Sequence, residues 1–108
     1  MRAERRREPR YPFNAMAEIV DERENARTSS RISDLSQHGC YVEMTNPFPQ
    51  GSNVLIEIYT ETESLETQAT VAFFEAQQGM GLTFREMPEY YTNVLNRWLA
   101  QAKGKKAN

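Results

Sequence analysis

The sequence LETQATVAFFEAQQGMGLTF, residues 65–84, decides the fold. Over residues 65–73, every second side chain would point to the same face of an extended chain, and most of these side chains are apolar. This period of two predicts a β-strand whose apolar face is buried. The segment 77–79, Gln-Gln-Gly, has the composition of a tight turn, and apolar residues alternate again over 80–84. The stretch therefore predicts a β-hairpin that covers a core.

Shorter segments with the same alternation lie upstream of this hairpin. They cover residues 15–19, 28–34, 40–44 and 54–59. Polar or Gly/Pro-rich connections separate them at 21–27, 36–39, 46–51 and 61–64. Short strands at this spacing, joined by turns, predict an antiparallel barrel of roughly six strands.

The period changes after the last strand. Pro88 and Glu89 suit the first turn of a helix. The apolar residues that follow have helical spacing: Tyr91, Val94, Leu95, Trp98 and Leu99. We therefore expect an all-β fold with one C-terminal helix, whose apolar face, Trp98 included, packs over a barrel mouth or against a partner. Lys103, Lys105 and Lys106 are expected to form a basic tail after the helix.

Composition limits the classes of function. The 108 residues suit one soluble domain, without an apolar run that could span a bilayer and without a visible signal peptide. Cys40 is the only cysteine and His38 the only histidine, so an intrachain disulfide is excluded and a zinc site is not expected. We expect an inert, partly buried Cys40 and an exposed loop His38. No nucleophile–base pair is apparent, so the sequence indicates neither an enzyme nor a cofactor, and the lone thiol fits the cytoplasm.

Positive charge is concentrated at the N-terminus. Residues 1–10 contain five arginines, Arg2, Arg5, Arg6, Arg7 and Arg10, whereas residues 11–102 carry five arginines against thirteen carboxylates. Residues 1–12 are expected to be a flexible arm, because they are highly charged and almost without apolar side chains. Arginine suits bidentate binding of phosphate and of guanine edges. A solvated tail or a nonspecific polyanion-binding tail is the plainer interpretation of such an arm.

Asp34-x-Ser36-x-x-Gly39 is the second motif. Asp and Ser side chains stabilise ordinary turns, and Gly supplies a positive φ or allows close approach of a ligand or backbone. In a binding site, the carboxylate would accept hydrogen bonds from the N1–H and N2–H₂ groups of guanine, and the hydroxyl would donate or accept beside it. Either motif alone is a weak signal.

Together, the motifs and their positions in the chain resemble the PilZ domain family, bacterial receptors for cyclic di-GMP. Arg6-x-x-x-Arg10 precedes the first strand, Asp34-x-Ser36-x-x-Gly39 joins the second and third, and Gly79-Met80-Gly81-Leu82-Thr83-Phe84 ends the barrel. The resemblance runs from Glu4 to about Ala102. It implies a six-stranded antiparallel PilZ-type barrel with the ligand between arm and barrel surface.

The resemblance also implies roles for individual residues. Arg6 and Arg10 would hold phosphates and guanine Hoogsteen edges, Asp34 and Ser36 would read guanine, and Gly39 would allow close approach. A cation just before the first motif arginine, here Arg5, favours a stacked dimer of the ligand.

These observations predict three segments: a flexible arm (1–12), a PilZ barrel plus helix (13–102) and a basic tail (103–108). We expect a cytoplasmic receptor or adaptor for cyclic di-GMP that orders its arm on binding and signals to an unidentified downstream protein, without membrane insertion. A PilZ-like protein–protein adaptor that binds no nucleotide is the first alternative. A small barrel that binds RNA or single-stranded DNA is the second, but the acidic body disfavours nucleic-acid polymers.

Overall fold

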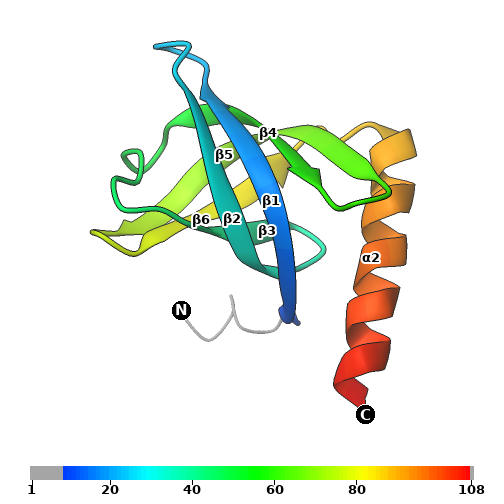
Figure 1. The fold of residues 1–108 in the computed structure, drawn as a ribbon. Coiled ribbons are helices and arrows are strands. Elements are labelled where there is room, and N and C mark those ends of the chain that lie inside the picture. Colours follow the sequence, from blue (N-terminus) through cyan, green and yellow to red (C-terminus); the bar gives the residue numbers. More distant parts are fainter. Residues whose placement is uncertain (1–8, 108) are drawn as a thin grey trace.

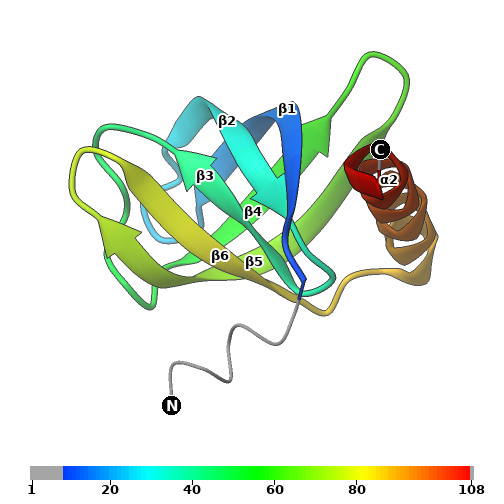
Figure 2. The same cartoon turned by 90° about the horizontal axis from the view of Figure 1, so that it is seen from below.

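The computed structural model describes residues 9–107 of the chain. Its elements, in order, are β1 (Tyr11–Asp21), β2 (Arg27–Leu35), β3 (Gly39–Glu43), β4 (Asn53–Tyr59), β5 (Ser64–Glu75), β6 (Gly79–Arg85) and α2 (Glu89–Ala107). The strands form a closed antiparallel barrel in the order β1-β2-β3-β6-β5-β4, and β4 pairs with β1 to close the ring. Figures 1 and 2 show this ring with α2 outside it. The predicted six-stranded antiparallel barrel with a C-terminal helix is confirmed.

The barrel interior is filled by alternate residues of every strand, as the period of two requires. The fully buried members are Ala17, Ile19, Ile32, Leu35, Val42, Val54, Ile56, Ile58, Leu65, Ala69 and Met80. Closure leaves these strands without a free edge, so their backbone hydrogen bonds are satisfied within the barrel.

Phe73 is the exception to the predicted alternation. The sequence pattern placed it inward with Leu65 and Val71, but its side chain is 37% exposed, and the next residue, Phe74, is 48% exposed. The cause is a register shift: Val71 pairs with Leu82, whereas Phe73 pairs with Gly81. Two residues of β5 thus span one step of β6, and the bulge turns the Phe73 ring to the outer surface.

Two element boundaries differ from the sequence pattern. β1 begins at Tyr11 instead of Ala15, and Pro12 lies in the strand opposite Asp34. Proline is tolerated there because it lies next to the strand's first residue. At the other end, α2 continues to Ala107, so that Lys103 belongs to the helix instead of following it as a tail. No helix within residues 9–107 is both long and apolar enough to span a membrane.

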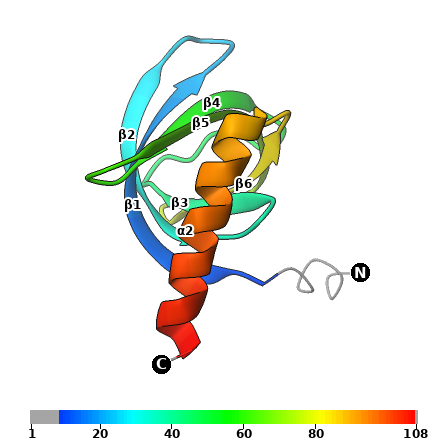
Figure 3. The same cartoon turned by 90° about the vertical axis from the view of Figure 1, so that its right-hand side faces the viewer.

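α2 lies across one open end of the barrel, as Figure 3 shows, which confirms one of the two predicted positions. Val94, Leu95 and Trp98 join the barrel core. The Trp98 ring stacks on Phe13 of β1 at a centroid distance of 5.3 Å, and its Nε1–H donates to Glu63 Oε1 at 3.0 Å. Arg97 also donates to the Glu63 carboxylate, and this bond, with Trp98, holds the pKa of Glu63 below its ordinary value against the effect of burial. One carboxylate on the β4–β5 turn thus fixes two consecutive helix residues.

Candidate functional site

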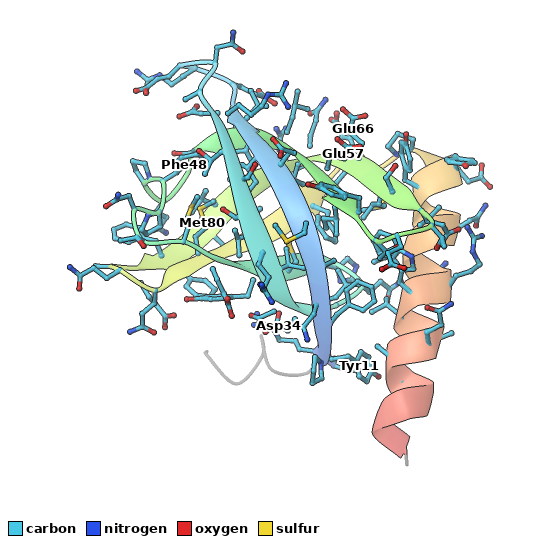
Figure 4. All side chains as sticks on the ribbon, viewed as in Figure 1. Tyr11, Asp34, Phe48, Glu57, Glu66 and Met80 are labelled. Atoms are coloured by element: carbon cyan, nitrogen blue, oxygen red, sulfur yellow. The ribbon has the colours of Figure 1, made fainter. Side chains whose placement is uncertain are left out.

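The start of β1 lies beside the end of β2. Tyr11 pairs with Leu35 and Pro12 pairs with Asp34, so the chain entering β1 passes the Asp34-x-Ser36-x-x-Gly39 motif. Figure 4 shows Asp34 next to Tyr11 at the lower end of the barrel. Sheet pairing thereby brings Arg10 to a motif 24 residues away in sequence.

Two register shifts converge on this part of β2. The β1–β2 pairing shifts between Pro12 and Ala15, and the β2–β3 pairing shifts between Ile32 and Asp34. Such irregularities redirect side chains and are common beside functional sites. Here Asp34 is only partly buried, although the core residues Ile32 and Leu35 flank it closely in sequence.

Arg10 and Asp34 form an ion pair. Nη2 of Arg10 lies 3.2 Å from Oδ1 and 3.4 Å from Oδ2 of Asp34, and the two side chains are 44% and 31% exposed. Exposed pairs of this kind contribute at most about 1 kcal/mol to stability. Either partner can therefore exchange the other for a stronger ligand contact at little cost to the fold.

Ser36 and Gly39 hold the β2–β3 turn together. The Ser36 backbone N–H donates to the Gly39 carbonyl at 2.8 Å, and the Gly39 N–H donates to Ser36 Oγ at 3.1 Å. Ser36 Oγ also lies 3.2 Å from the Gly39 carbonyl oxygen and can donate to it. Ser36 is buried, and its hydroxyl is engaged within the turn. Its contribution to a site is therefore to shape the turn that holds Asp34.

Gly39 is required by the barrel itself. A Cβ atom on it would lie 2.1 Å from the carbonyl oxygen of Leu82 on β6. Its φ is not positive, so the possibility that glycine supplies a left-handed turn here is wrong; among the glycines described, only Gly51 has a positive φ. Close approach of two backbones explains the residue.

Replacing Gly39 with alanine is expected to lower the free energy of unfolding by about 1–3 kcal/mol, because β3 and β6 must separate to admit the methyl group. Gly104→Ala is the matched control. Gly104 lies in α2, where an added Cβ would meet nothing within 4 Å, and alanine there should raise stability by up to about 1 kcal/mol. Urea unfolding of both variants measures the difference. Equal stabilities for Gly39→Ala and the unsubstituted protein would show that the strands accommodate the side chain.

A hollow of about 260 Å³ opens next to the ion pair. One side of the lining comes from the arm, the β2–β3 turn and the start of β3, and the other side comes from strands β5 and β6. The residues are Arg10, Ser36, His38, Gly39 and Cys40, then Ala72, Phe73, Gly81, Leu82 and Thr83. Enclosed small-molecule pockets usually measure roughly 300–1,000 Å³. A dinucleotide would therefore need further walls beyond those that residues 9–107 supply.

Phe73 and Gly81 are pocket residues that the sequence analysis did not identify. A Cβ on Gly81 would lie 2.2 Å from Cε1 of Phe73, so the phenyl ring covers the glycine. Tyr41 flanks the ring at a centroid distance of 6.2 Å. Burial, together with the hydrogen bond that Tyr41 donates to Glu75, raises the pKa of Tyr41 to about 12. The signal in the sequence was the pair of glycines at 79 and 81, because glycine within a strand marks close approach of another group.

His38 is exposed as expected, whereas Cys40 is more deeply buried than expected. Cys40 is 3% exposed, and burial, followed by the charge of Asp34, raises the pKa of its thiol, while Arg10 opposes the shift. A protonated, buried thiol is unreactive. His38 is exposed in the turn, and its carbonyl oxygen accepts the Phe84 N–H at 2.8 Å, which ties the turn to β6.

The structure thus brings together four of the six predicted site residues, Arg10, Asp34, Ser36 and Gly39. Arg5 and Arg6 lie outside the described residues. The chain enters β1 at the rim of the hollow, so the predicted arm is continuous with the site through Arg10.

Comparison with known structures supports the fold. The PilZ domain of Escherichia coli YcgR, solved with cyclic di-GMP, is 14% identical with a TM-score of 0.77, and the match covers 94% of each chain. Bacillus subtilis MotI/DgrA, an inhibitor of motility, is 18% identical with a TM-score of 0.77 over 94% of this chain and 52% of that one. Borreliella burgdorferi PlzA, solved in complex with cyclic di-GMP, is 16% identical with a TM-score of 0.66 over 83% and 39%.

No curated protein sequence matches the chain. The model of the PilZ domain family does match it, over residues 4–101. This range includes both motifs, the whole barrel and most of α2. The chain therefore belongs to the PilZ domain family.

Proposed function

We propose that this protein is a cytoplasmic receptor for cyclic di-GMP that orders its arginine arm over the barrel and presents the result to a downstream protein. The observation that carries the proposal is the pairing of Arg10 with Asp34 at the rim of the hollow. It supports the proposal because a guanidinium group, which can bind phosphate, and a carboxylate, which can accept from guanine, lie within reach of one ligand. The YcgR and PlzA structures, which are PilZ-fold neighbours solved with cyclic di-GMP, agree with this choice of ligand.

Binding would replace the ion pair by ligand contacts to both of its members. Arg10 turns to a phosphate or to the O6/N7 edge of guanine, which suits its planar guanidinium group. Asp34 then accepts from guanine N1–H and N2–H₂, so that neither charge is left without a partner. Phe73 lines the opposite wall with a partly exposed ring, on which a base would stack.

Calorimetric titration of the full chain tests the assignment, with cyclic di-AMP as the control ligand. The two dinucleotides carry the same phosphates, but adenine lacks the N1–H and N2–H₂ donors that Asp34 would bind. We expect binding of cyclic di-GMP only. No heat with either ligand would reject the receptor role and leave the nucleotide-independent adaptor. Equal binding of both ligands would mean that the site binds phosphate without distinguishing guanine from adenine.

We expect the arm to become protected when the ligand binds. Amide exchange across residues 2–10 should slow with cyclic di-GMP, because guanidinium contacts to phosphate bring the arm against the hollow. Exchange in the core of β4, which contributes no residue to the hollow, should change less and serves as the internal control. An arm that is already protected without ligand would indicate a preformed site instead of an ordering switch.

The number of bound ligands should depend on Arg5. A stacked pair of cyclic di-GMP molecules carries four phosphate charges, so it needs more cations than Arg6 and Arg10 supply, and a guanidinium plane can also stack on guanine. We expect two ligands per chain, and Arg5→Leu should lower the calorimetric ratio to one without abolishing binding. Arg7→Leu is the matched control for lost charge in the arm. A ratio of one for the unsubstituted protein would leave Arg5 an ordinary member of a basic arm.

A further inference from the structure

The outer surface of β1 and β4 carries an ordered set of side chains away from the hollow. Three cross-strand pairs face outward in register, apolar, acidic and apolar in turn: Met16 with Tyr59, Glu18 with Glu57, and Val20 with Leu55. The intervening residues are buried in the core, so these pairs form one continuous stripe along the barrel. We call these six residues the β1–β4 stripe.

The acidic step of the stripe continues onto β5. Glu57 pairs with Glu66, so Glu18, Glu57 and Glu66 form a row across three strands. Glu18 accepts a hydrogen bond from Ser29 and lies 3.7 Å from Arg27, but Glu57 and Glu66 have no ion pair or hydrogen bond to any described residue. Figure 4 shows these two side chains next to each other on the outer surface. Like charges directly opposite destabilise a sheet, so a cation from outside would relieve a cost that the free protein bears.

Two hollows lie next to each other on this surface and share Tyr59 and Thr60 in their linings. A mostly apolar hollow of about 460 Å³ is lined by Ala15, Met16 and Tyr59, and its lining also includes one charged residue of each sign, Arg31 and Glu61. An acidic hollow of about 530 Å³ adjoins it and is lined in part by Glu18, Glu57 and Tyr59. An apolar recess and a negative recess therefore lie next to each other. They can be filled by one side chain with an apolar stem and a cationic end, or by two neighbouring side chains, one apolar and one cationic.

We propose that the β1–β4 stripe docks a basic amphipathic helix of a partner protein. A strand cannot add to this surface by main-chain pairing, because the barrel is closed. Nucleic acids and anionic membranes are repelled by the glutamate row. Successive pairs of the stripe lie about 6.4–6.8 Å apart along the strands, and residues i and i+4 of a helix rise by about 6 Å. A helix with apolar, cationic and apolar side chains on successive turns thus matches the stripe step by step.

The β1–β4 stripe would be the surface through which the protein contacts its proposed downstream partner. Peptide binding to the stripe can be measured without nucleotide, so it can fail while cyclic di-GMP binding holds. The probe is a synthetic helical peptide of about 18 residues with leucine, arginine and leucine on successive turns of one face. Its twin carries glutamate in place of arginine. Titration of the isotope-labelled full chain should shift amide resonances of β1, β4 and β5 with the arginine peptide and leave them unchanged with the glutamate peptide.

Two single substitutions distinguish binding at the β1–β4 stripe from attraction by the overall negative charge of the barrel. Glu57→Gln should weaken binding of the arginine peptide about three- to five-fold, as the loss of one exposed charge contact predicts. Glu43→Gln, an exposed carboxylate on β3, should change the affinity by less than about two-fold. Equal effects of the two substitutions, shifts spread over the whole surface, or no shift at millimolar peptide would overturn the proposal. Shifts of the same residues on raising the protein concentration alone would assign the stripe to a second copy of this chain and also overturn it.

Discussion

Replacing Arg6 and Arg10 together with alanine is expected to lower the affinity for cyclic di-GMP by at least about a hundredfold. Each charge-assisted contact contributes about 1.5–3 kcal/mol, so each single substitution should cost at least about tenfold. The physical reason is visible at Arg10, whose guanidinium group already lies 3.2 Å from a carboxylate oxygen and faces the hollow. Calorimetry with the single and double variants measures the loss.

The matched control removes the same charge from a remote part of the barrel. Arg23 and Arg27 lie at the β1–β2 turn, at the opposite end of β1 from Arg10, and both are exposed. Replacing both with alanine removes two positive charges, as the Arg6/Arg10 double variant does. The affinity for cyclic di-GMP should nevertheless change by less than about threefold, because remote surface charge acts only through screened attraction. If the Arg6/Arg10 double variant binds like the unsubstituted protein, the proposed site is wrong.

Trp98→Ala is expected to lower the free energy of unfolding by about 3–5 kcal/mol. The side chain is 2% exposed, stacks on Phe13 and donates its indole N–H to Glu63, so truncation removes packing and leaves a cavity between α2 and the barrel. Circular dichroism in urea measures the loss without relying on the missing tryptophan. Tyr90→Ala, in the same helix but at a side chain 71% exposed, should cost less than about 1 kcal/mol.

The outcome decides whether α2 is integral to the domain. A large loss for Trp98→Ala with a single cooperative transition means that helix and barrel unfold as one unit. Unchanged barrel unfolding would instead make α2 an appendage. Because Phe13 lies only three residues after Arg10 in the chain, an integral helix also places Trp98 close to where the arm enters β1.

The sequence alone predicted the features that depend on local periodicity. Alternation over 65–73 and the turn at 77–79 predicted the β5–β6 hairpin, and the helical spacing from Tyr91 to Leu99 predicted α2 and the burial of Trp98. These patterns can be read within one segment because a half-buried strand or helix imposes its own period. The closed barrel followed from the number and spacing of the strands.

Features that depend on pairing between distant strands were not predictable in this way. The outward Phe73 follows from a register shift against β6, and the early start of β1 follows from pairing with the end of β2. The role of Gly39 depends on its distance to Leu82, and the Arg10–Asp34 pair depends on two bulged strands meeting. None of these has a local signature, although the family resemblance named Arg10, Asp34 and Gly39 as site residues.

The ion pair between Arg10 and Asp34 has a consequence for discrimination among phosphates. Any anion that recruits Arg10 must first detach it from Asp34, and a simple phosphate then leaves the carboxylate without a counterion next to a second negative charge. At the proposed site, a guanine nucleotide would compensate both members at once, because its phosphate would replace the carboxylate and its base edge would replace the guanidinium group. By competing for Arg10, the carboxylate would lower the affinity of a simple phosphate by up to about fivefold, the limit that an exposed ion pair sets, whereas a ligand with both halves would escape this cost.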